Sequence, residues 1–233
     1  MSRGPHLYWL TQTLADLPPT DDWLSNGERQ TLSALRFRKR RDDWRLGRWT
    51  AKLAVRAFLS GANPALRLDE IEIEAAADGA PHPIVFGTPA DFSVSLSHSG
   101  DRGLAVVASA GVAAGCDIEL VDPHILEFII DYLTPQETAA LAAAGPDERP
   151  LVAALYWSAK ESALKALREG LRRDTRSVTV RLEPAPAGRA WERCSVRCEQ
   201  TGRMFDGWWQ RDSRYVWTIA AEAPAAEPIL LRV

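Results

Sequence analysis

Residues in the first half of the chain alternate between apolar and polar side chains over several short stretches. An alternation with a period of two is typical of strands that bury one face. The last two of these stretches are joined by Ala110-Gly111, which predicts a long hairpin. Residues 78–89 are rich in proline and glycine and are predicted to be irregular. The predicted strands are residues 7–13, 71–75, 92–96, 104–109 and 112–120.

A helical pattern lies between the first and the second of these strands. Ser25 and Glu28 have the spacing of a capping box, in which each side chain bonds the backbone of the other residue. Apolar residues then recur at helical intervals among many basic ones, as far as the breaker sequence that begins at Gly61. We therefore predict one helical region that starts at Ser25 and ends before Gly61.

The second half of the chain repeats this order of helices followed by strands. A second capping-box spacing lies at Thr134 and Glu137, and a helix is predicted over residues 150–168. We therefore predict an α+β fold with two similar lobes, residues 1–115 and 116–233. We expect no residue-level identity between the halves, so the repeat is predicted to be one of structure only. Strands are predicted at residues 177–182, 191–199, 204–209 and 215–221.

The composition narrows the class of protein. With 46% hydrophobic and 25% charged residues, the chain has the usage of globular proteins rather than of disordered ones. The net charge of −3 lacks the basic excess of nucleic-acid binders, so we expect no nucleic-acid partner. The apolar runs are too short to span a bilayer, and the three cysteines cannot all pair. We expect a cytoplasmic protein that binds no membrane.

Carboxylates gather in two of the predicted elements. Asp117 and Glu119 lie two apart near a strand end, so they share a face and could hold one hard cation; a solvated acidic strand end has the same pattern. On the helix predicted over residues 150–168, Glu161 lies four residues from both Trp157 and Lys165. A surface Glu–Lys pair is the alternative there. The tryptophan favours a partly buried face, on which charges need partners or a ligand.

Polar and basic groups elsewhere offer donors for an anion. The stretch Ser97-His98-Ser99 ends a predicted strand and either binds phosphate oxygens or forms a plain turn. Residues 36–56 are rich in arginine and lysine. Such a run could bind an anionic ligand, form a solvated helix face or contact nucleic acid.

Taken together and in this order, these stretches resemble the phosphopantetheinyl transferases of the larger, monomeric class, which activates nonribosomal peptide and polyketide synthases. That family carries a Ser-His-Ser stretch, then Gly-x-Asp-x-Glu, then Trp-x-x-Lys-Glu-x-x-x-Lys. A basic helix like the one predicted here precedes these motifs, so the resemblance covers residues 36–171. In this chain the motifs are Ser97-His98-Ser99, Gly115-Cys116-Asp117-Ile118-Glu119 and Trp157-Ser158-Ala159-Lys160-Glu161-Ser162-Ala163-Leu164-Lys165.

The resemblance implies a fold, a reaction and a set of ligands. The fold is a pseudo-dimer of two α+β lobes, each with helices packed on a small antiparallel sheet, with coenzyme A and Mg²⁺ between them. The enzyme moves phosphopantetheine from coenzyme A to a serine of an acyl or peptidyl carrier protein, releases 3′,5′-ADP and is a monomer. The implied magnesium ligands are Asp117, Glu119 and Glu161, and the implied coenzyme A ligands are Arg41, Arg48, Ser97, His98, Lys160 and Lys165.

The same resemblance makes Glu161 and Lys165 the catalytic residues. Glu161 is expected to take the proton of the acceptor serine, directly or through a water, besides binding Mg²⁺. Lys165 is expected to add positive charge at the pyrophosphate, where a hard cation also neutralises the charge that builds on the leaving group.

One family motif is altered in this chain. Members often carry Gly-Lys-Pro before the Ser-His stretch, whereas Gly79-Ala80-Pro81-His82-Pro83 holds no lysine. Either His82 replaces that lysine at the nucleotide or the contact is weaker. Two alternative functions are a non-catalytic coenzyme A-binding regulator of the same fold and a magnesium-dependent phosphohydrolase.

Overall fold

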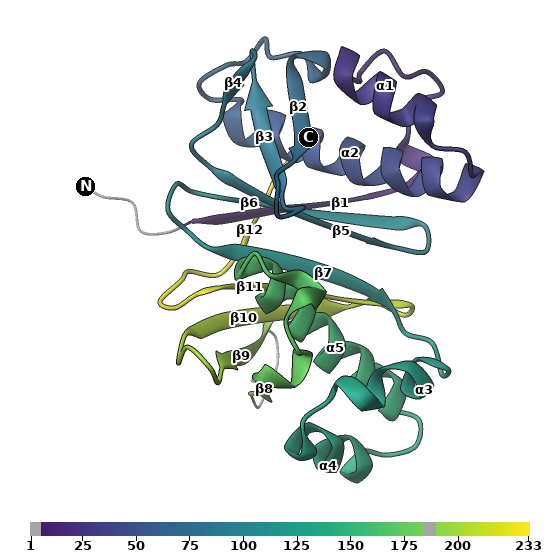
Figure 1. Ribbon diagram of the computed structural model, residues 1–233, viewed down its shortest axis with the longest axis vertical. Coiled ribbons are helices and arrows are strands. Elements are labelled where there is room, and N and C mark those ends of the chain that lie inside the picture. Colours follow the sequence, from purple (N-terminus) through teal and green to yellow (C-terminus); the bar gives the residue numbers. More distant parts are fainter. Residues whose placement is uncertain (1–5, 184–189) are drawn as a thin grey trace. The chain divides into compact units, whose positions relative to one another are not determined.

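The structure is a computed structural model that describes residues 6–183 and 190–233 (Figure 1). The chain divides into two compact units. Unit 1 runs as far as Val112 and includes Pro228–Val233, and unit 2 is Ala113–Glu227. Each unit combines helices and strands, so the predicted α+β class is confirmed. The pseudo-dimer stays a prediction.

Unit 1 contains two sheets, in the orders β12-β1-β6-β5 and β2-β3-β4. The C-terminal strand β12 belongs to this unit because it pairs in parallel with β1, with Ile229 opposite Tyr8. The helices are α1 (Asn26–Ala34) and α2 (Arg38–Leu59), with short 3-10 helices at Leu14–Asp16 and Leu68–Glu70. The strands are β1 (Leu7–Thr13), β2 (Ile71–Ala75), β3 (Pro81–Val85), β4 (Thr88–Pro89), β5 (Ser93–Ser99), β6 (Arg102–Ala108) and β12 (Ile229–Leu230).

The single helical region predicted for this unit is in fact two helices. The backbones of Leu35 and Phe37 are extended and separate α1 from α2. Leu32 of α1 is buried in a cluster with Trp23 and Leu24. This cluster holds α1 in a packing site of its own, so the apolar pattern that continues through the break does not produce one continuous helix.

The segment 78–89 contains β3 and β4, so the prediction that it is irregular is wrong. Phe86 and Gly87 between the two strands have φ of 52° and 74°, in the left-handed region. Pro81 and Pro83 lie on the part of β3 that pairs with β2 but not with β4. A strand with one neighbour tolerates the missing N–H of proline, which is why the composition did not reveal these strands.

Unit 2 contains a five-stranded antiparallel sheet in the order β7-β11-β10-β9-β8. The helices are α3 (Ile125–Ile129), α4 (Pro135–Ala143) and α5 (Arg149–Ala166), with 3-10 helices at Ile130–Tyr132, Gly170–Arg172 and Thr175–Ser177. The strands are β7 (Ala114–Leu120), β8 (Val178–Leu182), β9 (Glu192–Cys198), β10 (Met204–Arg211) and β11 (Tyr215–Glu222).

The long hairpin predicted around Ala110-Gly111 is wrong. Strand β6 pairs with β1 and β5 in unit 1, whereas β7 pairs with β11 in unit 2. The turn therefore connects two sheets. Small turn residues serve a hairpin and a connection equally well, so only the distant partner strands decide between them.

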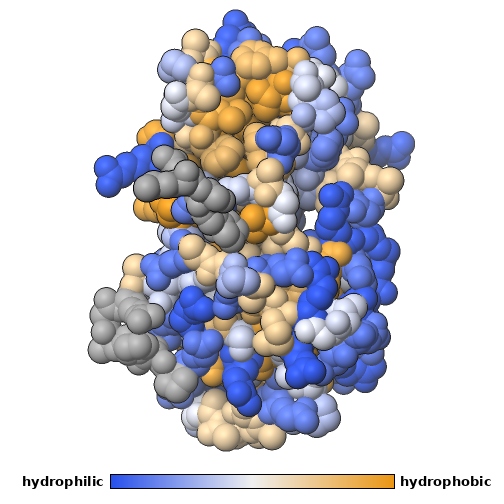
Figure 2. Space-filling view, turned by 90° about the vertical axis from the view of Figure 1, so that its left-hand side faces the viewer, coloured by the Kyte–Doolittle hydropathy of each residue, from blue (hydrophilic) through white to orange (hydrophobic). Residues whose placement is uncertain are grey.

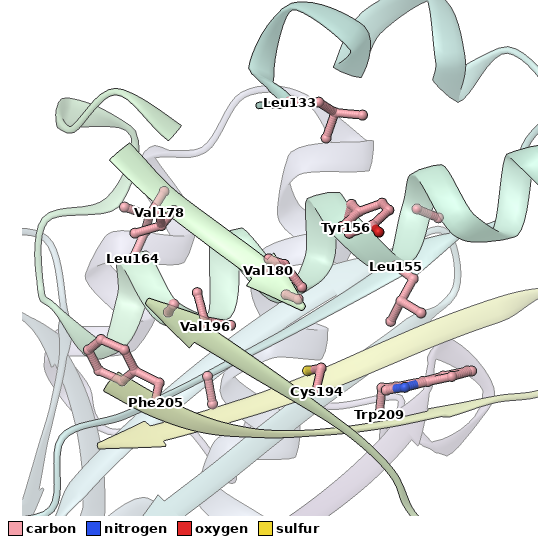
Figure 3. Close-up of a cluster of buried hydrophobic side chains, with 14 of the residues drawn as sticks. Leu133, Leu155, Tyr156, Leu164, Val178, Val180, Cys194, Val196, Phe205 and Trp209 are labelled. Carbon is pink, nitrogen blue, oxygen red and sulfur yellow. The ribbon is translucent and has the colours of Figure 1, made fainter. Parts of the chain in front are cut away.

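The core of unit 2 lies between α5 and the sheet (Figure 3). Tyr156 and Leu164 of α5 belong to one buried cluster with Val180 and Val196 of the strands and with Phe205. Burying each large apolar side chain contributes about 1.5–3 kcal/mol, so this packing fixes which face of α5 points away from the cluster. Glu161 and Lys165 do not belong to this cluster.

A buried glutamate ties three elements of unit 1 together. The carboxylate of Glu28 accepts hydrogen bonds from the backbone N–H of Ser25 (3.0 Å) and of Ile73 (3.1 Å), and it forms an ion pair with Lys52 of α2. Neither charged side chain reaches the solvent to more than 3%. The start of α1, strand β2 and helix α2 are therefore joined through one carboxylate.

Unit 2 repeats this arrangement with Glu137 and Lys160, which form a buried ion pair at 2.9 Å. The residues that lead to the lysine match as well: Trp49-Thr50-Ala51-Lys52 lies on α2 and Trp157-Ser158-Ala159-Lys160 on α5. The expectation of no residue-level identity between the halves is therefore wrong. The shared residues are too few to stand out until the glutamate that partners each lysine is located in space.

The surface of unit 1 shows apolar side chains gathered on one face (Figure 2). A pocket of 310 Å³ in this unit is lined by residues that include Arg56, Asn63 and Arg232, and none of the predicted site residues lines it. No helix of the described part of the chain is both long and apolar enough to cross a membrane.

Candidate active site

Strand β7 presents two carboxylates to helix α5. Gly115, Asp117 and Glu119 share one face of the strand because side chains alternate along it. A Cβ atom on Gly115 would lie 2.0 Å from the carbonyl oxygen of Ser162, so only glycine permits this approach. The glycine of the Gly-x-Asp-x-Glu motif thus brings α5 against the strand beside its carboxylates.

Helix α5 contributes side chains at i,i+4 spacing to the same place. The Lys165 ammonium donates to Asp117 Oδ1 at 2.8 Å and to the Cys116 carbonyl at 3.0 Å. The indole Nε1 of Trp157 donates to Glu119 Oε1 at 2.9 Å. The structure therefore brings Trp157 and Lys165 of α5 to the two carboxylates of β7. Below, "the acidic site" means Asp117, Glu119, Glu161 and Lys165.

The acidic site carries more negative than positive charge. Glu161 Oε1 is buried and accepts no hydrogen bond from the residues that the structure describes. Burial raises the pKa of Glu161, the nearby Asp117 carboxylate raises it further, and Lys165 opposes both effects. Burial would lower the pKa of Lys165, but Asp117 and Glu161 raise it overall. Lys165 therefore stays charged while several carboxylates share it.

The carboxylate oxygens of the acidic site are of the chemical kind that binds a hard cation. Carboxylate oxygens are what Mg²⁺ prefers, and the buried Glu161 oxygen lacks a compensating donor. Within residues 6–183 and 190–233, no group of three or more His, Cys, Asp or Glu side chains is gathered so that it could hold a metal ion. The magnesium set Asp117, Glu119 and Glu161 stays a prediction.

Sequence reasoning missed a hydroxyl cluster that holds α5 on the sheet. Ser158 Oγ lies 3.0 Å from Thr218 Oγ1, and Ser162 Oγ lies 2.6 Å from the same atom. Ser162 Oγ also donates to the Thr218 carbonyl at 3.1 Å. All three side chains are buried. Two serines four residues apart on one helix were the available signal, since buried hydroxyls need a partner.

Lys160, predicted as a coenzyme A ligand, lies away from the acidic site in a buried network. Its ammonium contacts Glu137, Thr175 and Val178. Burial lowers its pKa and the Glu137 carboxylate opposes this shift. A contact between Lys160 and a pyrophosphate stays a prediction that would require the lysine to leave these partners.

The remaining predicted ligands belong to unit 1. Ser97 is buried and His98 exposed, both near the end of β5. The guanidinium of Arg41 donates to the Leu32 carbonyl at 3.4 Å. The guanidinium of Arg48 lies 4.8 Å from the centre of the Trp44 ring, and its buried Nε donates to no group in the described chain. Burial lowers the pKa of Arg48, and the carboxylate of Glu28 opposes this shift.

Residues 113–220 match the model of a family of group-transfer enzymes. Its description is the 4′-phosphopantetheinyl transferase superfamily. The matched residues include the whole acidic site, so the match supports a transferase and suggests phosphopantetheine transfer. A comparison with curated proteins gave no match.

Proposed function

We propose that this chain transfers the phosphopantetheine arm of coenzyme A to a serine of an acyl or peptidyl carrier protein in a Mg²⁺-dependent reaction. The observation that carries the proposal is the packing of Glu161 and Lys165 against Asp117. It lies within the region that matches the transferase superfamily. We assign the chain to the larger, monomeric class and expect it to act in the cytoplasm.

Glu161 is the proposed base. The serine oxygen forms a bond to the phosphorus of the phosphopantetheine arm, the bond from that phosphorus to the bridging oxygen breaks, and 3′,5′-ADP leaves. The serine proton passes to Glu161, whose pKa is raised by burial and by Asp117. A carboxylate with a raised pKa is a stronger base than an ordinary one, which suits this task.

Lys165 and the carboxylates balance charge around the base. Asp117 holds the Lys165 ammonium at 2.8 Å, so a positive charge is fixed beside Glu161. This ammonium would stabilise charge on the leaving pyrophosphate oxygens. Asp117, Glu119 and Glu161 would hold Mg²⁺, which when bound supplies further positive charge for those oxygens.

Residues of unit 1 are proposed to bind the nucleotide part of coenzyme A. Arg48 has a buried nitrogen with no acceptor in the described chain, which supports a role for this guanidinium in binding a phosphate. Arg41, Ser97 and His98 are assigned with it from the resemblance. Ala80 stands where the family often has lysine, and half-buried His82 is proposed to replace that lysine.

The test is intact-mass analysis of an apo carrier protein incubated with the chain, coenzyme A and Mg²⁺. A mass gain of one phosphopantetheine arm that disappears with a chelator supports the proposal. Glu161→Gln should abolish the gain, and Glu227→Gln, at an exposed position in the same unit, is the matched control.

Two results would favour a different function. Coenzyme A binding without transfer to any of several carriers would favour the non-catalytic regulator. Hydrolysis of coenzyme A in the absence of a carrier would favour the phosphohydrolase.

A further inference from the structure

The ammonium of Lys160 has no donor left for a ligand. It contacts Glu137 Oε2 at 2.9 Å, the Thr175 carbonyl at 3.0 Å and the Val178 carbonyl at 2.5 Å. A lysine has three N–H donors, so these partners use all of them. The side chain is fully buried. This environment differs from that of Lys165, whose side chain is 26% exposed beside Asp117.

Glu137 connects this lysine to two other elements. Its carboxylate accepts the backbone N–H of Thr134 at 2.7 Å, at the start of α4, and that of Val180 at 2.8 Å, on β8. Glu137 is 1% exposed. Through one carboxylate, α5 is therefore attached to α4 and to the strand β8, which is at the opposite edge of the sheet from β7.

Unit 1 contains a similar buried lysine–glutamate ion pair, but it lies outside the acidic site. Lys52 forms an ion pair with Glu28, and the backbone of Ile73 donates to the same carboxylate. The residue after Lys52 is Leu53, whereas the residue after Lys160 is Glu161. The lysine thus recurs on a helix that lacks the glutamate proposed as base. Its recurrence follows the packing of the helix rather than the chemistry.

We propose that Lys160 is a positioning residue, which fixes the rotation and height of α5 so that Glu161 and Lys165 meet Asp117. Lys160 and Glu161 are consecutive on the helix, so any rotation about the axis of α5 moves both. The ion pair with Glu137 fixes the position of Lys160, and the neighbouring Glu161 is therefore held beside β7. The role in turnover rests on the proposed function, whereas the role in holding α5 does not.

The experiment compares Lys160→Met with Lys52→Met, the matched variant in unit 1. We measure urea unfolding, coenzyme A binding by calorimetry, and the kcat and KM of transfer under conditions in which each variant is folded. Both variants should unfold at lower urea than the wild type. Lys160→Met should lower kcat by about 10- to 100-fold, as for residues that orient catalytic ligands, with an unchanged affinity for coenzyme A. Lys52→Met should keep its kcat.

A double variant keeps the test decisive if Lys160→Met does not fold. Lys160→Met with Glu137→Gln leaves no buried charge unpartnered and retains an acceptor for Val180, so it should regain much of the lost stability. A folded single or double variant with wild-type unfolding but strongly weakened coenzyme A binding would overturn the proposal and make Lys160 a pyrophosphate ligand. If the wild type transfers nothing, the proposed function fails, and the unfolding and calorimetry results still decide the role of Lys160.

Discussion

In each unit a helix that carries a buried lysine packs on a seven-residue strand, α2 on β1 and α5 on β7, and the side chains in these two places differ. Leu10 is the fourth of seven residues in β1, and Asp117 is the fourth of seven in β7. Leu53 follows the buried lysine of α2, and Glu161 follows that of α5. Leu10 and Leu53 belong to one buried apolar cluster.

The corresponding pair in unit 2 is Asp117 and Glu161, with Lys165 as a shared cation. Apolar packing stabilises the pair in unit 1, whereas burial of like charges opposes folding in unit 2. A helix packed on a strand thus contributes to the apolar core in unit 1 and to the proposed active site in unit 2.

Replacing Glu161 of unit 2 by leucine, the residue that follows the buried lysine in unit 1, should have the largest effect on activity. Glu161→Leu places the residue found after Lys52 into α5. We expect transfer to fall by about 10²- to 10⁴-fold, the range for loss of a positioned base, while the protein becomes more stable. Intact-mass assays and urea unfolding measure the two effects. A variant that retains wild-type turnover would show that Glu161 is not the base.

Removing the glutamate of either buried ion pair, Glu28 in unit 1 or Glu137 in unit 2, should have the largest effect on stability. The effect should be similar in the two units. Glu28→Ala and Glu137→Ala each remove the negative charge that pairs with a buried lysine. Each should lower the free energy of unfolding by about 3–5 kcal/mol, the cost of breaking a buried ion pair. Urea unfolding of the two variants gives the comparison. A loss in only one of them would contradict equivalent roles for the two networks.

Replacing Gly115, where α5 lies close to β7, should lower the free energy of unfolding less than breaking a buried ion pair does. In Gly115→Ala the new methyl meets backbone atoms of Ser162 and Ala166, so we expect a loss of about 1–3 kcal/mol together with reduced turnover. In Gly103→Ala of unit 1 it meets the side chains of Thr50 and Leu46, which can move, so the loss should be smaller. Equal losses in urea unfolding would count against this distinction.

The smallest expected effect is on pH dependence. Burial and Asp117 raise the pKa of Glu161 against the opposing field of Lys165, so the folded state binds this proton more tightly than the unfolded chain. Stability from this group is greatest below the ordinary glutamate pKa and falls as the pH rises toward the raised value. The free energy of unfolding of the wild type minus that of Glu161→Gln, measured with a chelator present, should therefore decrease over this interval. An increase would contradict the assigned direction.

Local patterns were sufficient for much of the fold. Both capping boxes form as predicted, with Ser25 and Thr134 accepting from the glutamate three residues later. The strand predicted over residues 7–13 and the helix predicted from residue 150 are confirmed. These elements are predictable because their signals lie within a few residues of each other.

Errors arose where pairing depends on distant residues. The false hairpin at Ala110-Gly111 and the missed strands in 78–89 both required knowledge of which strand would lie alongside. The role of Lys160 required the position of Glu137, which is 23 residues earlier and on another helix. A helical pattern shows which residues share a face but not what that face meets.

The α+β class and the two capping boxes could be read from the sequence alone, because their signals lie in local spacing. Asp117, Glu119, Glu161 and Lys165 were joined into one candidate site by the resemblance to a family, since spacing gave only the shared faces within each element. The partners of the two lysines, Asp117 for Lys165 and Glu137 for Lys160, became known from the three-dimensional packing. Two lysines five residues apart on one helix point in different directions, and the packing of α5 determines which residues each of them meets.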